Sequence, residues 1–515
     1  MKRSGLWTLI LGMAPTAALA QQAPAAEAPQ ERVAAPAQTA PVPPAPPTLP
    51  AVLTPVPGGM TVEQVAGRAI RAAAQVRAAE ANVDVADAAR SEAGLAMIPS
   101  LTLQARYTRL SSITAPQLNF GSAAAFCVNP QNSALYAGTS MNGQTVCLNP
   151  RDSVAPPSTG SAGFSFPVIL DQYVFHGTLT VPISDIPFRL ARLYEAAGRT
   201  AEARRLDAEA TRAQAAADGR VAFYEYMRAQ GQAAIAEQAV ETVRRHRDDL
   251  NRFVEAGTVA RVELLRVEAQ VAETERMAVM AREGLGVSEA NLRIRILQQP
   301  GERITLGEAL DAPIERLPGN VQELIDQAWR SRPELISLER QVSAIDANLA
   351  AVRAGYFPSL VGQANLDIAN PNQRFVPQSQ EFNTTWDASL ILQWSPTAAI
   401  QNGATASRVV AQREAVRAQI GALLAGVELD VRGAWVNVQG ARAAIEAAGR
   451  QIAAAEEAYR VRRERFAAGS AISSDLTDAE NDLLRARFAL VNAHVDLRVA
   501  LARLRRAVGT PEARR

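Results

Sequence analysis

The sequence predicts a mixed α/β membrane protein, built by internal duplication, in which long antiparallel coiled-coil helices are joined to four β-strands. Three observations predict this fold: a helical hairpin that occurs twice, a helix-to-strand junction that occurs twice, and four alternating segments beside those junctions. The 515-residue chain is only 5% aromatic, which suits long packed helices better than a thick globular core.

The hairpin is the clearest repeat, and its tip is a glycine turn. Arg252 is followed by Phe-Val-Glu-Ala-Gly-Thr, and Arg465 is followed by Phe-Ala-Ala-Gly-Ser. Beyond Gly257 and Gly469 both copies carry an apolar seam at steps of three and four residues, which predicts a helix that ends at the glycine and a coiled-coil partner that returns. The seam positions are Leu264, Val267, Val271, Thr274, Ala278, Ala281, Leu285, Ser288 and Leu292, and then Leu476, Ala479, Leu483, Ala486, Leu490, Ala493, Leu497, Ala500 and Leu504.

The N-terminal residues have the pattern of an export signal. Lys2 and Arg3 precede an apolar run that ends in a small-residue cleavage site, Ala18-Leu19-Ala20. We therefore expect residues 1–20 to be a cleaved signal peptide. Residues 21–60 are rich in Pro and Ala, and we expect a disordered linker there. No later stretch has the ~20 uninterrupted apolar residues of a membrane helix.

Each half begins with a helix that stops at a Pro-Ser-Leu junction. The first helix is expected over Thr61–Met97, before Pro99; the second starts near Val321, with Pro333 a possible break, and stops before Pro358. After each junction the hydrophobic period changes to two, and a second alternating segment follows later. Strands of ~10 residues with one apolar side and aromatic ends are typical of membrane β-barrels, although a soluble sheet with one wet face has the same alternation. The expected strands cover 101–107, 173–183, 360–368 and 386–394.

The remaining segments complete two matching halves. Residues 61–298 are expected to form the first repeat and 321–509 the second, with a linker at 299–320 and a C-terminal tail at 510–515. The helices expected over 188–255 and 397–467 are each roughly 100 Å long at 1.5 Å per residue. A return helix stacked on one of the shorter helices would match that length. We therefore expect a long cylinder of paired helices.

The long segment between the first two strands holds the only two cysteines, Cys127 and Cys147. In an exported protein an isolated pair in one loop is most simply a disulfide; two free thiols are the alternative. Two cysteines alone are too few for a metal site.

The composition argues against catalysis and against nucleic-acid binding. The chain has 53 basic and 52 acidic residues, so no net field attracts a polyanion. No phosphate loop, dinucleotide fingerprint or nucleophile elbow is present, and we expect no cofactor and no metal. The histidines His176, His246 and His494 are scattered, and we interpret them as ordinary packed or solvated side chains.

Four strands cannot close a barrel, because closure needs about eight or more. An open sheet edge cannot face lipid, so membrane strands demand oligomerisation, and three chains would supply twelve.

The sequence resembles the TolC family of outer-membrane efflux and secretion channels over about residues 61–509. The resemblance rests on the duplicated order of elements, both Pro-Ser-Leu junctions and both hairpin-tip motifs. It implies a homotrimer whose strands form one shared 12-stranded β-barrel in outer-membrane lipid and whose coiled-coil helices form a periplasmic barrel. It also implies passive export in tripartite efflux or type I secretion, with a periplasmic adaptor (membrane fusion) protein and an inner-membrane pump of the RND or ABC type.

The resemblance also assigns site residues. Asp475 and Asp478 match the family's Asp-x-x-Asp, which lines the periplasmic entrance; three copies would form acidic rings that attract cations. A solvated acidic pair at a helix start is the alternative. Glu263 occupies the equivalent site of the first half. Ala471 replaces the family's basic gate residue, which leaves Arg261 of the other half as a gate candidate.

The tip turns are candidate adaptor-docking sites, at Gly257 and Thr258 and at Gly469 and Ser470. Their alternative interpretation is that of simple turn residues. For the whole chain the alternative is a secreted coiled-coil or adhesin-like structural protein without channel activity, which accounts for the heptads and not for the four strands.

Overall fold

The computed structural model describes residues 50–112, 168–299, 302, 304–314, 320–376 and 378–509, and short pieces of the segment between them at 117–118, 126–131, 135–137, 139–141, 144–147, 149, 151–154 and 164–165. The expected signal peptide, most of the linker 21–60 and the tail 510–515 lie outside the described residues. Among the residues that the structure describes, none of the helices combines the length and apolar character that a membrane crossing requires.

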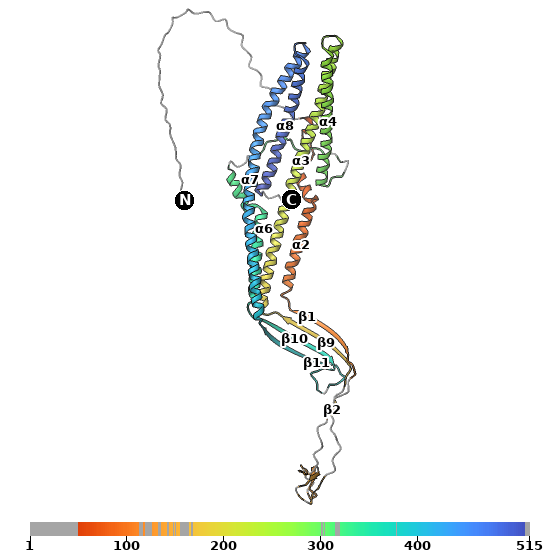
Figure 1. Ribbon diagram of the computed structural model, residues 1–515, viewed down its shortest axis with the longest axis vertical. Coiled ribbons are helices and arrows are strands. Elements are labelled where there is room, and N and C mark those ends of the chain that lie inside the picture. The colour runs from red at the N-terminus through yellow and green to blue at the C-terminus, as the bar shows by residue number, and fades with distance from the viewer. Residues whose placement is uncertain are drawn as a thin grey trace, which may run out of the picture. The chain divides into compact units, whose positions relative to one another are not determined.

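The two halves repeat one order of elements, which Figure 1 shows along the chain. The first half contains α1 (Val62–Ala72), α2 (Ala74–Leu95), β1 (Ser100–Arg109), β9 (Asp171–Val181), a π-helical turn η2 (Ile186–Leu190), α3 (Ala191–Glu255) and α4 (Arg261–Ile296). The second half contains α5 (Val321–Ser331), α6 (Pro333–Ala354), β10 (Ser359–Asn370), β11 (Asn383–Gln393), α7 (Pro396–Ala467) and α8 (Ser473–Val508). A 3-10 turn at Ala51–Leu53 precedes α1, and the short strands β2 to β8 lie between β1 and β9.

The four long strands form one antiparallel sheet in the order β1-β9-β10-β11. The expected pairs within each half are present, and the pairing of β9 with β10 joins the halves. Polar side chains on one face form hydrogen bonds across strands. His176 Nδ1 lies 2.5 Å from Asp367 Oδ1, and Asn365 Nδ2 donates to Asp387 Oδ2 over 2.9 Å. Strands β1 and β11 are the edges of this sheet in a single chain.

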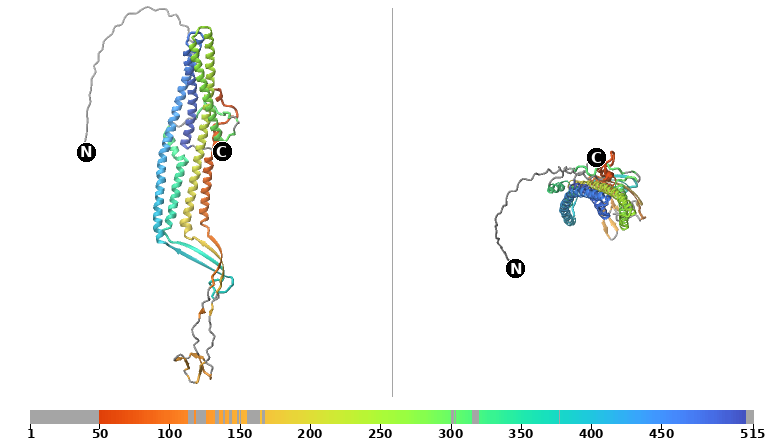
Figure 2. Two further views of the ribbon diagram at one scale, coloured as in Figure 1. Left: turned by 45° about the vertical axis from the view of Figure 1, so that its right-hand side comes forward. Right: turned by 90° about the horizontal axis from the view of Figure 1, so that it is seen from above.

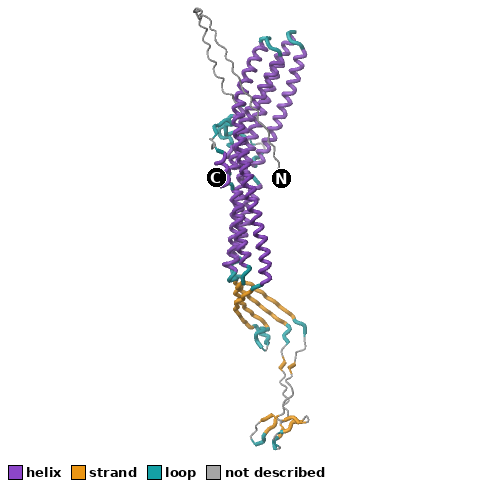
Figure 3. Tube along the Cα trace, turned by 60° about the vertical axis from the view of Figure 1, so that its left-hand side comes forward, coloured by secondary structure: helices purple, strands orange, loops and turns teal. Residues whose placement is uncertain are grey.

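Within the unit Pro47–Arg515, the helices lie side by side, apart from the long strands (Figure 3). Near the tips the row is α4, α3, α8 and α7; toward the sheet it is α2, α3, α6 and α7. Figure 2 shows that this row follows an arc. Every predicted seam residue of α8 is buried, and those of α4 are buried or half-buried, so the heptad prediction is confirmed. Helix α7 is an edge of the row over both regions.

The first helix is not continuous, which corrects the expected helix over 61–97. It divides at Ala73, where φ is −65° and ψ is 116°. The expected break before Pro333 has nearly the same geometry, with φ −68° and ψ 119° at Arg332. Alanine favours helix, so local propensity does not cause the break at Ala73. We attribute the break to packing. It lets α1 bury Val65 and Ala69 against the core while α2 packs along α3.

The end of the linker 21–60 is ordered, contrary to the expected disorder, because Leu53 is buried in the core. The backbone N–H of Met60 donates to Thr305 over 2.8 Å, and that of Gly307 donates to Met60 over 2.9 Å. A Cβ at Gly307 would lie 2.2 Å from the carbonyl oxygen of Gly59. The two linkers therefore meet at a backbone contact that admits no side chain.

We predict that Gly307→Ala destabilises the fold by several degrees in melting temperature, because backbone atoms of Gly59 must move. Gly67→Ala is the control, since its Cβ would meet only the end of Arg71 at 3.8 Å. It should be neutral or stabilising by about 1 kcal/mol, the helix propensity difference. Circular dichroism melts compare the two; equal melting temperatures would contradict the close approach.

Candidate functional site

The two hairpin tips have the same turn geometry. Gly257 has φ +72° and Gly469 has φ +70°, values that favour glycine. Thr258 donates its backbone N–H to Phe253 over 3.0 Å, and Ser470 donates its own to Arg465 over 2.8 Å. These are Schellman turns, which satisfy carbonyls at the ends of α3 and α7.

The hydroxyl groups of these turns are hydrogen-bonded to the preceding helix, whereas the space around the glycines is open. The Thr258 hydroxyl donates to Phe253 over 2.9 Å, and the Ser470 hydroxyl donates to Arg465 over 3.1 Å. A Cβ on either tip glycine would meet nothing within 4 Å. The glycines are therefore needed for their backbone conformation, and the space around them is open to another molecule.

Asp475 and Asp478 lie in the first turns of α8 on its exposed side. They are three residues apart, so their carboxylates share one face of the helix. Among the described residues neither carboxylate has a hydrogen bond or an ion pair. Leu476 and Ala479, on the opposite side, are buried in the seam. The arrangement presents two carboxylates near the tip, and the guanidinium of Arg462 lies beside them, since it donates to the Asp475 carbonyl oxygen over 3.2 Å.

The matching site of the first half is neutralised. Glu263 lies 3.4 Å from Arg266 on α4, and Arg266 stands where the second half has Asp478. Arg261 is exposed, and no ion pair joins it to an acidic side chain in the part of the chain that the structure describes. The structure therefore does not bring the gate candidate Arg261 against the acidic pair.

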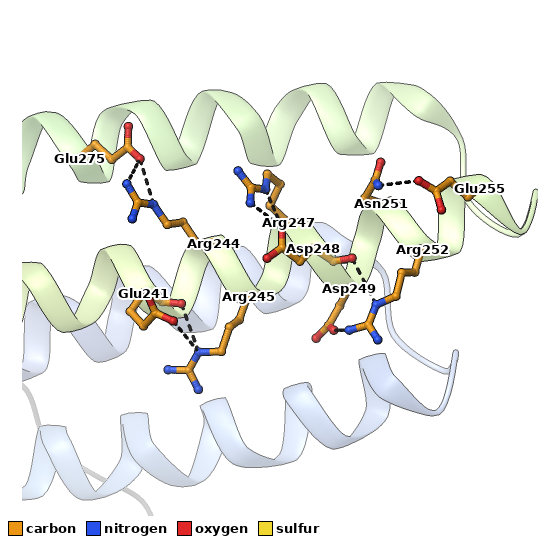
Figure 4. A network of polar contacts seen from close by, with 10 residues as sticks. All are labelled: Glu241, Arg244, Arg245, Arg247, Asp248, Asp249, Asn251, Arg252, Glu255 and Glu275. Atoms are coloured by element: carbon orange, nitrogen blue, oxygen red, sulfur yellow. Dashed lines mark hydrogen bonds and ion pairs between the residues drawn. The ribbon is translucent and has the colours of Figure 1, made fainter.

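Ion pairs follow the exposed sides of α3 in the first hairpin, and Arg245, Asp249 and Arg252 of this set also line a cavity beside His246 (Figure 4). Arg244 of α3 and Glu275 of α4 are 2.6 Å apart and join the two helices. The other pairs drawn, such as Arg245 with Glu241, lie within α3. Exposed pairs of this kind contribute little to stability and keep a surface soluble. Alternating charges along the helix fit the interpretation of a solvated face.

His246 is the functional candidate that sequence analysis missed. It is buried between Glu480 and Ser473 of α8, which agrees with the packed alternative of the sequence interpretation but gives the side chain two specific partners. Its partners lie more than 200 positions away, so no local pattern could reveal the contact. His494 is half-buried, and burial lowers its pKa. Within the described ranges, no three His, Cys, Asp or Glu side chains gather closely enough to hold a metal ion.

Cys127 and Cys147 form a disulfide with an S–S distance of 2.02 Å. Cys127 is fully buried and lies in β3 (Phe126–Val128), which pairs with β4 (Leu135–Ala137) and β7 (Ser153–Val154). The disulfide therefore closes a covalent loop within the segment between β1 and β9.

Comparison with solved structures identifies similar folds. The outer-membrane channel OprN matches with a TM-score of 0.66 and 18% identity, covering 87% of this chain and 89% of OprN. CusC, whose structures concern folding and transmembrane channel formation, matches with a TM-score of 0.67 and 15% identity, covering 87% of this chain and 92% of CusC. The open state of the Neisseria gonorrhoeae MtrE outer membrane channel matches with a TM-score of 0.66 and 18% identity, covering 87% and 88%. These likenesses show the fold.

A search of curated proteins found no match. The family model described as outer membrane efflux protein matches residues 65–294 and 324–510, which are the two structural repeats. This match covers most of the chain and has two segments, one in each structural repeat. The chain therefore belongs to the outer membrane efflux protein family, the TolC family of outer-membrane efflux channels, and is a transport protein and not an enzyme.

Proposed function

We propose that the chain acts as a homotrimer whose strands form one 12-stranded barrel in the outer membrane and whose helices form a tunnel in the periplasm. Members of this family act in tripartite efflux systems. Here the channel would pass substrates passively from a periplasmic adaptor and an inner-membrane pump of the RND or ABC type, or serve type I secretion. A cleaved signal at residues 1–20 would export it.

The observation that carries this proposal is the pair of open sheet edges. Unpaired backbone N–H and C=O groups on β1 and β11 would cost several kcal/mol each in hydrocarbon. Large apolar side chains of the sheet are nevertheless exposed, among them Leu103 and Leu390. Lipid accepts these side chains, and pairing of β11 with β1 of the next copy removes both edges. The coiled-coil alternative offers no account of this sheet.

The helical row has matching free edges. On α7 the exposed glycines Gly426, Gly433 and Gly440 follow at heptad spacing, and a Cβ on each would meet nothing within 4 Å. Each glycine within a helix costs about 1 kcal/mol relative to alanine, so an exposed series without contacts needs a reason. Small residues let a second helix approach closely.

Helix α4, at the other end of the row, has exposed apolar side chains that would fit the glycine face of α7. Near the tips that edge is α4, whose Val287 and Ile294 are 71% and 74% exposed and also one heptad apart. They lie about as many residues from their tip as Gly440 and Gly433 lie from theirs. The arc of the row (Figure 2) then lets α4 of one copy meet α7 of the next.

We predict that the wild-type protein extracted in detergent has a protein mass near three times that of the mature chain, which is just under 55.0 kDa. Replacing Gly426, Gly433 and Gly440 by Leu should shift it toward the monomer, because the added side chains fill the contact face. Light scattering corrected for bound detergent measures both masses.

The control is Gly421→Leu, since Gly421 is an exposed glycine of α7 outside the heptad series. Considered as a single helix, every one of these variants gains helix propensity. A triple variant that remains trimeric would therefore contradict the proposed seam, and a wild-type monomer would contradict barrel closure by three chains.

Three copies of α8 would bring the free carboxylates of Asp475 and Asp478 around one axis. Stacked acidic rings lower the energy of cations in a narrow passage and raise that of anions. We predict that Asp475→Asn with Asp478→Asn lowers the cation preference of the channel several-fold in planar bilayers, measured as a reversal potential under a salt gradient. Stability should not change, because neither carboxylate has a described partner.

The matched control is Glu263→Gln at the equivalent site. Arg266 already offsets that charge, so the change in selectivity should be much smaller. Unchanged selectivity in the double aspartate variant would show that Asp475 and Asp478 do not line the entrance.

The open tip turns are proposed as the adaptor-docking sites. Asparagine tolerates positive φ, so Gly257→Asn with Gly469→Asn should keep both turns while adding side chains in open space. In the native host we predict slower efflux of a substrate dye, with trimer mass and bilayer conductance unchanged. Normal efflux in this variant would contradict adaptor docking at the tips. The role of Gly257, Thr258, Gly469 and Ser470 would then be only to form the turns.

A further inference from the structure

A buried polar contact joins the two hairpins close to their tips. His246 of α3 is 3% exposed and Glu480 of α8 is 8% exposed. The imidazole Nδ1 lies 3.1 Å from Glu480 Oε2, and Nε2 lies 3.3 Å from Ser473 Oγ. Ser473 and Glu480 are one heptad apart, so they lie on the same face of α8. Both ring nitrogens are thus occupied by one neighbouring helix.

Aromatic rings pack against this buried contact, and a cavity lined by charged side chains, among them Arg245 and Asp249, also borders it. The ring of Phe466 meets the imidazole edge-on with centroids 5.1 Å apart, and Phe253 meets Phe466 at 5.6 Å. In such surroundings a polar group without a partner costs about 1–3 kcal/mol. Turning α8 would break both hydrogen bonds that His246 makes to that helix. The contact therefore favours one rotation of α8, in the manner of buried polar residues that set the register of coiled coils.

A third helix closes the site. Tyr459 of α7 is half-buried beside Glu480; burial raises the pKa of its phenol, and the Glu480 carboxylate adds to the shift. By the Arg-Phe motif Tyr459 is the counterpart of His246 in the second half. Glu268, the counterpart of Glu480 in the first half, is exposed. Helices α3, α7 and α8 thus meet at Glu480, whereas the matching position of α4 faces away.

The rotation of α8 decides where its acidic pair lies. Each residue advances a helix by about 100°, so Asp475 lies about 200° from Ser473, and Asp478 lies about 200° from Glu480. The seam of α8 alternates leucines with alanines, and the alanine positions, among them Ala479, Ala486 and Ala493, make few contacts that oppose a small rotation. The polar contact adds a directional constraint to this packing.

We propose that His246 is a positioning residue: by binding Ser473 and Glu480 it fixes the rotation of α8 and holds Asp475 and Asp478 on the exposed side. The role of that side as a channel entrance rests on the proposed function. The positioning itself does not, and it can be measured without channel activity.

The test is thiol reactivity in the full-length protein. Cys127 and Cys147 are paired, so one introduced cysteine supplies a reactive thiol. In the parent, Asp475→Cys should react with a maleimide far faster than Leu476→Cys, because position 475 is exposed and position 476 is buried. Adding His246→Leu should reduce the ratio of the two rates by about tenfold, since a penalty on the scale of one lost buried polar contact no longer opposes rotation.

The structural control is Leu250→Ala, which removes a fully buried side chain of α3 from the same apolar cluster. It should lower the melting temperature and leave the rate ratio unchanged. His246→Gln, which keeps a donor and an acceptor, should restore most of the ratio. Ser473→Ala removes only the partner of Nε2, should lower the ratio by a smaller factor, and provides a second variant if His246→Leu does not fold. An unchanged ratio in His246→Leu and Ser473→Ala, or an equal loss in Leu250→Ala, would overturn the proposal.

Bilayer recordings separate this inference from the proposed function. If wild-type protein conducts, His246→Leu should lower cation preference and Leu250→Ala should not; equal selectivity in all three would overturn the role at the entrance. If wild-type protein does not conduct while the rate ratio still falls in His246→Leu, the proposed function fails and the positioning stands.

Discussion

The structure depends on one constraint: every backbone polar group that meets hydrocarbon must be hydrogen-bonded. A chain with four membrane strands leaves two edges unpaired, and no change of side chains removes that cost. The edges β1 and β11 stand at opposite sides of the sheet, just as α7 and the pair α2 and α4 stand at opposite ends of the helical row. In the proposed trimer, strand pairing between copies would bring the matching helical edges together as well, so one requirement would organise both parts of the chain.

Duplication supplies the repeated geometry, and small departures from it supply the differences on which function depends. Both halves have Schellman turns at the tips and a similar break within the helical segment that precedes their first long strand. At the tips, however, Arg266 neutralises Glu263, whereas Asp478 adds to the charge of Asp475. The two copies of the hairpin thus differ in charge at this site: the carboxylate of Glu263 is paired with Arg266, whereas those of Asp475 and Asp478 are not paired with a described basic side chain.

Much of this architecture could be predicted from the sequence, because it is encoded in periodicity over neighbouring residues. The seams, the hairpin tips and the strand pairs within each half follow from steps of three and four or of two. The break at Ala73, the ordered contact of Met60 with Thr305 and the burial of His246 could not be predicted, because each depends on partners far along the chain. Local propensity even favours the opposite outcome at Ala73.

The contrast between the seam and the polar contact explains why α8 carries both. The hydrophobic effect is non-directional, and the alternating leucines and alanines of the seam stabilise α8 against its neighbours mainly through the apolar area that they bury. A hydrogen-bonded pair is directional, because distance and angle must both be satisfied. The seam therefore holds the helices together, while His246 with Ser473 and Glu480 selects one arrangement among them. The acidic pair lies on the same two turns of α8, so a constraint at this level controls its direction most closely.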